Sequence, residues 1–325
     1  MSSTFENLHV GIQLTESCDL ACRHCCTTSS PKVTTTLDRE YVRDILRQAA
    51  DIDPHAEVVF TGGEVFYVRD LLYYAIGVVR ELGLGYSINT NGSWAVDPAE
   101  CREVLDTILD VRRIAFGTDD YHDPAVPKRA VGRALQEAMR SGVPAMIRYT
   151  FAAGEDFEQV YRELGLTTEE ERARVEFSGI MPVGRAVRLD PTVFPVFPER
   201  EPCFAANTIM IRSTGVIYGC CGDSMYLPGK HDLRHGHVKT TPLKEVLSAR
   251  ESNVVLQTIR TIGPRPLAVA AGAIRDTPED EMFSRSPCGS CHLMLQERNK
   301  DKTRAAAEEF RDRVTALRAF YYGEI

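Results

Sequence analysis

The sequence has no apolar run long enough to cross a bilayer, and its first residues show no basic segment followed by an apolar one. It has no excess of positive charge either, because the net charge is −8 and the isoelectric point is near 5.6. The basic residues are dispersed among acidic ones and form no stripe that would bind phosphates. We therefore expect a cytoplasmic protein that binds neither a membrane nor nucleic acid.

The sequence does contain ten cysteines among its 325 residues. In a reducing compartment, thiols serve metal binding or redox chemistry more often than they form disulfides. With 43% hydrophobic residues the chain can bury a large core, and its length exceeds that of an average single domain. We expect one large domain followed by a smaller one.

Strand-like and helix-like segments alternate along the first part of the chain. Amphipathic segments of helical period separate short apolar or β-branched runs. These runs predict strands at residues 9–14, 57–63, 85–92, 112–118, 144–151 and 175–181. The order predicts an α/β fold with a parallel sheet, curled into a partial (β/α)6 barrel of the TIM type or opened flat. Its chemistry is expected at the carboxyl ends of the strands.

The alternation stops after Ala186, and segments rich in proline, cysteine and histidine follow. We predict a barrel domain over residues 1–198, a small domain over 199–296 and a C-terminal helix over 297–325. The helix is expected to pack on the body through the apolar face formed by Phe310, Val314, Leu317 and Tyr321.

A stretch with the sequence CDLACRHCC, at positions 18–26, follows the first predicted strand. Cys18, Cys22 and Cys25 have a Cys-x3-Cys-x2-Cys spacing, with which a short loop can wrap three thiolates around one face of a [4Fe-4S] cluster. Three ligands leave one iron open for a substrate. A structural zinc site is the alternative, but its fourth ligand would be Cys26, which is poorly placed beside Cys25 to join the same tetrahedron.

The cysteine spacing after a first strand resembles the signature of the radical S-adenosylmethionine (SAM) superfamily. This resemblance implies that SAM binds at the open iron. The segment TGGE after the second strand is where the family binds the methionine ammonium of SAM, because glycines allow a close approach and the glutamate offers a charge-assisted hydrogen bond. By resemblance the SAM pocket is lined by His24, Gly62, Gly63, Glu64, Asn91, Thr118, Asp119 and Arg148. For each of them a capping or surface role is the alternative.

A second iron–sulfur pattern lies in the smaller domain. Cys203, Gly215 and Cys220 form Cys-x11-Gly-x4-Cys. Cys288 and Cys291 add a Cys-x2-Cys motif. Together they resemble the Twitch half of SPASM/Twitch domains, which implies one auxiliary [4Fe-4S] cluster held by the four cysteines. A zinc ribbon held by the same four thiols is the alternative.

Cys221 is left outside both patterns. On an extended segment its side chain points away from that of Cys220, so its S–H is expected to face the cavity beside the cluster; an incidental buried cysteine is the alternative. Seven segments are together similar to the radical SAM peptide epimerases of epipeptide biosynthesis. They are CDLACRHCCTTSSP, FTGGEVF, NGSW, DDYHDPAV, MPVGRA, GVIYGCC and CGSC, in this order. In that family the second cysteine of the pair, here Cys221, delivers a hydrogen atom.

The resemblance implies an epimerase that converts L-residues of a ribosomally made precursor peptide into D-residues. A 5′-deoxyadenosyl radical would abstract the α-hydrogen, and hydrogen would return from the Cys221 thiol. An electron donor such as a ferredoxin or flavodoxin would be a further partner. Candidate substrate contacts, for which local hydrogen bonding is the alternative, are Asp119, Asp120, His122 and Arg185.

Two other functions stay open at this point. The Twitch arrangement also resembles the radical SAM dehydrogenases and epimerases of aminoglycoside pathways, and an acidic protein suits a cationic sugar. The other alternative is a scaffold without catalytic activity, in which both cysteine groups bind structural metal.

Overall fold

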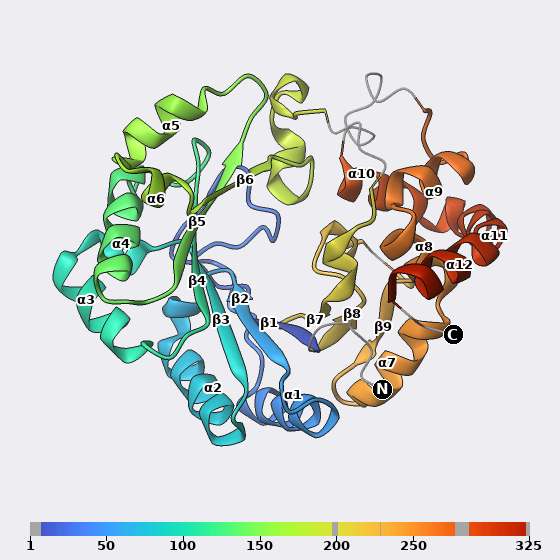
Figure 1. Ribbon diagram of the computed structural model, residues 1–325, viewed down its shortest axis with the longest axis horizontal. Coiled ribbons are helices and arrows are strands. Elements are labelled where there is room, and N and C mark those ends of the chain that lie inside the picture. Colours follow the sequence, from blue (N-terminus) through green and yellow to red (C-terminus); the bar gives the residue numbers. More distant parts are fainter. Residues whose placement is uncertain (1–7, 197–200, 228, 277–285, 323–325) are drawn as a thin grey trace.

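The computed structural model describes residues 8–196, 201–227, 229–276 and 286–322. Its first part alternates strands and helices, as predicted, with the helices on the outside of a curled sheet (Figure 1). The strands are β1 (His9–Thr15), β2 (Glu57–Gly62), β3 (Gly85–Thr90), β4 (Arg113–Thr118), β5 (Ala145–Phe151) and β6 (Val175–Gly179). The helices are α1 (Arg39–Ile52), α2 (Arg69–Leu82), α3 (Pro98–Thr107), α4 (Lys128–Arg140), α5 (Phe157–Leu164) and α6 (Glu169–Arg172).

The sheet continues from the barrel into the second part of the chain. Its nine strands lie in the order β6-β5-β4-β3-β2-β1-β7-β8-β9, and the added strands are β7 (Ile209–Ile211), β8 (Val216–Tyr218) and β9 (Arg234–His237). The first six strands pair in parallel with their neighbours in the chain. β7 pairs in parallel with β1, whereas β8 and β9 run antiparallel. The fold is the predicted partial (β/α)6 barrel, extended beyond β1 by three short strands.

Side chains alternate between the two faces of each strand, so that one face of the sheet is apolar and the other is free to meet a ligand. In β1, Val10, Ile12 and Leu14 are fully buried. They join one apolar cluster with residues of the surrounding helices, such as Leu46 of α1. On the opposite face Thr150 of β5 lines a cavity. The helices therefore close the outside of the barrel and leave its interior open.

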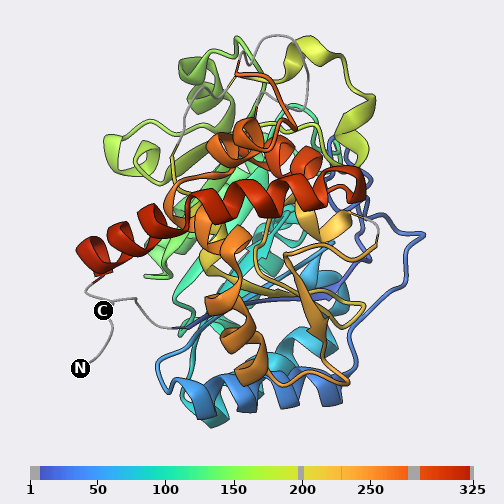
Figure 2. The same cartoon turned by 90° about the vertical axis from the view of Figure 1, so that its right-hand side faces the viewer.

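The second part has an apolar cluster of its own. Its helices are α7 (Leu243–Ser252), α8 (Val254–Thr261), α9 (Pro264–Ala270), α10 (Pro287–Met294), α11 (Lys300–Glu309) and α12 (Arg311–Tyr322). The predicted C-terminal helix is divided at Phe310, whose N–H donates to the carbonyl of Ala307 in a tighter turn. Both halves pack on α8 (Figure 2). Val314 is buried, as predicted, and the side chain of Tyr321 lies outside the described residues.

Short 3₁₀ helices connect the longer elements. They are η1 (Val65–Val68), η2 (Ser93–Val96), η3 (Gly184–Arg188), η4 (Pro191–Val193), η5 (Phe204–Asn207), η6 (Asp223–Tyr226) and η8 (Glu297–Asn299). In the described part of the chain, no helix combines the length and the apolar character needed to cross a membrane.

Two glycines inside helices test the packing of the barrel. A methyl group on Gly77 of α2 would meet no atom within 4 Å, whereas one on Gly132 of α4 would lie 1.9 Å from the carbonyl oxygen of Leu164. Alanine favours a helix over glycine by about 1 kcal/mol, so Gly77→Ala should raise the free energy of unfolding by about that amount. Gly132→Ala should lower it by at least about 1 kcal/mol, because the backbone must shift. Urea denaturation measures both, and equal effects would contradict this packing.

Candidate active site

The three cysteines of the first pattern lie in the loop that leaves the carboxyl end of β1. The N–H of Cys18 donates to the carbonyl of Ser30 (3.3 Å), which ties the two sides of the loop together. Cys18, Cys22 and Cys25 line one cavity of about 310 Å³, called here the barrel cavity. The fold therefore brings the three predicted ligands to one space at the carboxyl ends of the strands.

The surroundings of these thiols fit the ligands of a cluster. Cys18 Sγ accepts hydrogen bonds from the N–H of Leu20 (3.4 Å) and from Nδ2 of Asn91 (3.7 Å), and such donors stabilise a bound thiolate. Burial raises the pKa of Cys18 and of Cys22 to about 12, so a bound metal is needed to deprotonate them. Within the described ranges, no three His, Cys, Asp or Glu side chains gather as they would around a single ion. The loop thus presents three thiols to one cavity, as the predicted ligation of a [4Fe-4S] cluster requires.

Gly62, the last residue of β2, and Gly63, which follows it, close against the end of β1 and the start of the cysteine loop. A methyl group on Gly63 would lie 2.1 Å from the carbonyl oxygen of Ser17, and one on Gly62 would lie 2.7 Å from that of Thr15. Both glycines also line the barrel cavity. They are needed for the approach of two backbone segments to each other, in addition to the approach of a ligand that was predicted from the sequence.

Glu64 is not among the residues that line the barrel cavity. Its buried carboxylate accepts hydrogen bonds from the N–H groups of Phe66 (3.0 Å) and Asn91 (2.6 Å) and from Oγ1 of Thr90 (2.8 Å). Burial raises its pKa to about 7, although these hydrogen bonds lower it. Glu64 therefore joins the end of β3 to the segment after β2, and a contact with SAM stays a prediction.

Two histidines flank the buried carboxylate of Asp119, which follows β4. Asp119 Oδ2 lies 3.0 Å from His24 Nε2 and 3.8 Å from His122 Nδ1. Although burial opposes the shift, His122 and His24 hold the pKa of Asp119 well below its usual range. Both histidines line the barrel cavity, and neither ring nitrogen of His122 has a hydrogen-bond partner. Asp119 thus orients the rings from outside the cavity, and His122 can bind a ligand inside it.

Arg185, on η3, holds the other side of the cysteine loop. Its Nε donates to the carbonyl of Cys22 (2.8 Å) and its backbone N–H to that of Cys25 (3.0 Å). Its Nη2 is buried without a hydrogen-bond partner, and the side chain lines the barrel cavity. Arg185 therefore supports the loop and keeps one donor for a ligand.

Asn91 lines the barrel cavity, whereas three other candidates do not. Thr118 is buried at the end of β4, Asp120 pairs with Lys128, and Arg148 is exposed on β5 and pairs with a glutamate of β6 (3.3 Å). Further residues of the cavity wall were not predicted: Thr61, Thr150, Ser178, Ile180, Met181 and Val183. Their position at or just after the ends of predicted strands was the available signal.

The four cysteines of the second pattern line one small, separate cavity, called here the second cavity. Cys203 precedes η5 and Cys220 follows β8. Cys288 and Cys291 lie one turn apart at the start of α10, where the helix dipole favours thiolates. A methyl group on Gly222 would lie 3.0 Å from Cys288 Sγ, so this glycine leaves room for the sulfur. The fold thus gathers four thiols from three separate segments.

Cys221 does not line the second cavity, although its neighbour Cys220 does. The residue is exposed, and its Sγ lies 3.9 Å from the carbonyl oxygen of Ala205. The thiol therefore lies outside the second cavity, and it does not line the barrel cavity either.

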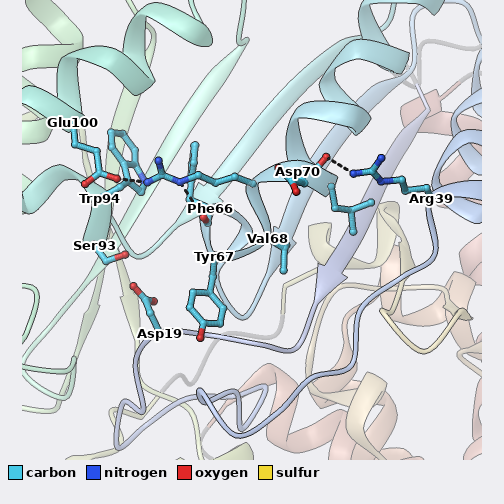
Figure 3. A pocket seen from close by; sticks show the side chains of 11 residues that line it. Asp19, Arg39, Phe66, Tyr67, Val68, Asp70, Ser93, Trp94 and Glu100 are labelled. Atoms are coloured by element: carbon cyan, nitrogen blue, oxygen red, sulfur yellow. Dashed lines mark hydrogen bonds and ion pairs between the residues drawn. The ribbon is translucent and has the colours of Figure 1, made fainter.

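A larger and more open depression of about 760 Å³ lies beside the start of α2 (Figure 3). Both of its arginines have partners, because Arg69 pairs with Glu100 and Arg39 donates to the carbonyl of Asp70 (3.3 Å). No cysteine is found among the described residues that line it. The barrel cavity is therefore the better candidate for catalysis.

Comparisons with known proteins agree with the resemblance predicted from the spacing of Cys18, Cys22 and Cys25. Residues 12–164 match the Radical SAM superfamily. YydG of Bacillus subtilis (strain 168), described as a peptide biosynthesis protein, is 28% identical over 136 residues, which are 41% of this chain and 43% of that protein. The matched region thus spans less than half of this relative's length.

Two solved structures share the fold. Native anSMEcpe with bound AdoMet and Cp18Cys peptide has a TM-score of 0.55 at 13% identity, covering 96% of this chain and 99% of that one. SuiB of Streptococcus suis bound to its precursor peptide SuiA has a TM-score of 0.58 at 13% identity, covering 89% of this chain and 71% of that one. At this identity the likeness concerns the fold alone.

The buried carboxyl group of Glu64 makes stability depend on pH. Its pKa is about 7 in the folded chain and about 4.3 in an unfolded one, so the folded state keeps a proton that the unfolded state loses. Stability should therefore fall as the pH rises from about 4.5 to about 7, by up to about 3 kcal/mol. Glu64→Gln should remove most of this loss, which urea denaturation of the metal-free protein at several pH values measures. The exposed Glu169→Gln is the control, and equal pH profiles for Glu64→Gln and the wild type would refute this effect.

Proposed function

We propose, from the membership of residues 12–164 in the radical SAM superfamily, that this protein is an epimerase that converts L-residues of a ribosomally made peptide into D-residues. A peptide substrate is supported by the similarity to YydG, described as a peptide biosynthesis protein. The observation that carries the reaction type is the Cys221 thiol, which lies outside both groups of proposed cluster ligands.

The barrel cavity supplies the residues for hydrogen abstraction. Cys18, Cys22 and Cys25 would hold a [4Fe-4S] cluster with one iron left for SAM. When bound, the cluster and SAM supply radical chemistry that can remove a hydrogen atom from an α-carbon. His122 and Arg185 carry buried nitrogens without hydrogen-bond partners in this cavity. We assign these two residues to the binding of the peptide.

The segment after β6 protects the reacting atoms. Its apolar side chains, Ile180, Met181 and Val183, line the barrel cavity. A reactive carbon radical must be kept away from water and from stray hydrogen donors. These side chains would therefore exclude water, while Arg185 fixes the loop at the carbonyl of Cys22 (2.8 Å).

The second cavity supplies ligands for an auxiliary [4Fe-4S] cluster. Its four thiols are those of Cys203, Cys220, Cys288 and Cys291. Cys220 Sγ also lies 2.9 Å from the hydroxyl oxygen of Ser224, which supports a thiolate at this position. When bound, the cluster would supply one-electron transfer next to Cys221.

Cys221 is the proposed hydrogen donor. An α-carbon that has lost its hydrogen atom is planar, so a hydrogen atom added from the opposite face gives the D-residue. In this step the S–H bond of Cys221 breaks and a C–H bond forms, which leaves a radical on the sulfur. One electron and one proton then restore the thiol, and a ferredoxin or flavodoxin is the proposed source of the electron.

The neighbouring cysteines provide a matched pair of variants. Cys221→Ala should bind as much iron as the wild type, about eight atoms per chain for two four-iron clusters. It should still form 5′-deoxyadenosine with a candidate precursor peptide but produce no D-residue, because only the returning hydrogen is missing. Cys220→Ala should lose about half of the iron, because it removes a ligand. Iron analysis and chiral amino-acid analysis measure these outcomes.

Two results would contradict these assignments. Normal formation of D-residues by Cys221→Ala would exclude it as the donor. Loss of iron from Cys221→Ala, with full iron in Cys220→Ala, would show that ligand and donor are exchanged.

A further inference from the structure

Arg250, on α7, is an arginine buried among backbone carbonyl groups, with only 3% of its surface exposed. Its Nη1 donates to the carbonyl oxygens of Thr208 (3.2 Å) and Gly219 (3.1 Å). Its Nη2 donates to those of Ala206 (2.9 Å) and Asn207 (3.2 Å). One guanidinium thus binds four carbonyl oxygens from two separate segments.

Both segments carry proposed ligands of the auxiliary cluster. The first is η5, Phe204–Asn207, which begins directly after Cys203. The second contains Gly219, which directly precedes Cys220. Arg250 therefore holds the backbone beside two of the four thiols.

The charge of Arg250 is not neutralised by an ion pair. The adjacent carboxylate, Glu251, instead lies 3.2 Å from Arg260 and 2.6 Å from Arg318. Among the residues that the structure describes, none forms an ion pair with Arg250. Carbonyl dipoles solvate this cation but do not cancel its charge. A net positive charge is therefore buried beside the second cavity.

The neighbouring His235 does not change the buried positive charge of Arg250. A methyl group on Gly219 would lie 2.6 Å from His235 Nε2, so this ring packs against the same segment. Burial, followed by the charge of Arg250, lowers the pKa of His235 to about 4. Burial and Arg260 lower the pKa of Arg250 to about 10. At neutral pH, His235 is neutral and Arg250 remains a cation.

We propose that Arg250 is a positioning residue that raises the reduction potential of the auxiliary cluster. Reduction adds one electron from an external reductant to a cluster that four thiolates make negative, and it breaks no bond. A buried cation stabilises the more negative, reduced form more than the oxidised form. This inference rests on the auxiliary cluster proposed above and does not depend on the epimerase reaction.

The test uses the full-length chain with Cys18, Cys22 and Cys25 replaced by alanine, so that only the auxiliary cluster remains. In this background Arg250→Gln removes the charge, Arg250→Lys keeps it with fewer hydrogen bonds, and Arg304→Gln is the control. Arg304 is half-exposed and pairs with Asp232 (2.7 Å). The measurement is a titration with dithionite as reductant, followed by electron paramagnetic resonance.

Arg250→Gln should lower the ratio of reduced to oxidised cluster at a fixed potential at least tenfold, which is 59 mV for one electron. Arg250→Lys and Arg304→Gln should change it less than about threefold. An unchanged reduction potential in Arg250→Gln would show that Arg250 acts only through its hydrogen bonds to the backbone. A potential that is lowered equally in Arg250→Lys and Arg250→Gln would show the same. Absence of iron from the parent chain would overturn the auxiliary cluster itself, and with it this inference.

If Arg250→Gln does not bind the cluster, the pH dependence of the reduction potential of Arg250→Lys tests the proposal instead. A buried lysine loses its proton more readily than arginine. The potential of Arg250→Lys should therefore fall below that of the Arg250 parent as the pH rises from about 7 to about 9, a range that stays below the pKa of about 10 of Arg250 itself. A constant difference over this range would overturn the proposal.

Discussion

The parallel pairing of β7 with β1 is the contact on which the rest of the arrangement depends. Val10 lies opposite Ile209 and Ile12 opposite Ile211, and all four side chains are fully buried. β1 leads into the first cysteine loop, and β7 leads through β8 to the second group of thiols. A shift of this register by one residue would turn the buried side chains to the wrong face. One short ladder therefore sets the position of Cys221 relative to the barrel.

The polar residues around the two cavities are of two kinds. Glu64, Asp119 and Arg250 are buried and have partners inside the protein, where they hold loops and strand ends. His122 and Arg185 line the barrel cavity and keep buried nitrogens without hydrogen-bond partners. Each such group costs about 1–3 kcal/mol, a cost that a bound ligand would offset. His122 and Arg185 are therefore two residues of the barrel cavity from which we expect contacts to a ligand.

The features that the sequence predicted are local ones. Apolar runs predicted the six barrel strands, and segments of helical period predicted the helices between them. The spacing of the cysteines predicted which thiols line each cavity. The direction of side chains beyond the strand ends was not predictable, because it depends on distant partners. Glu64, for example, turns to Asn91 across the end of β3. Arg250 carries no sequence signal at all, since it sits in an ordinary helical segment and its partners lie 31 to 44 residues away. The division of the last helix at Phe310 was likewise missed.

The most direct test of the central claim is to run the reaction in heavy water with peptides encoded by small reading frames beside the gene. A thiol exchanges its proton with solvent, so a hydrogen atom returned by Cys221 should be deuterium. We expect the product to gain one mass unit per converted residue, located at the α-carbon of a D-residue. A product that is lighter by two hydrogens, or a D-residue without deuterium, would contradict it.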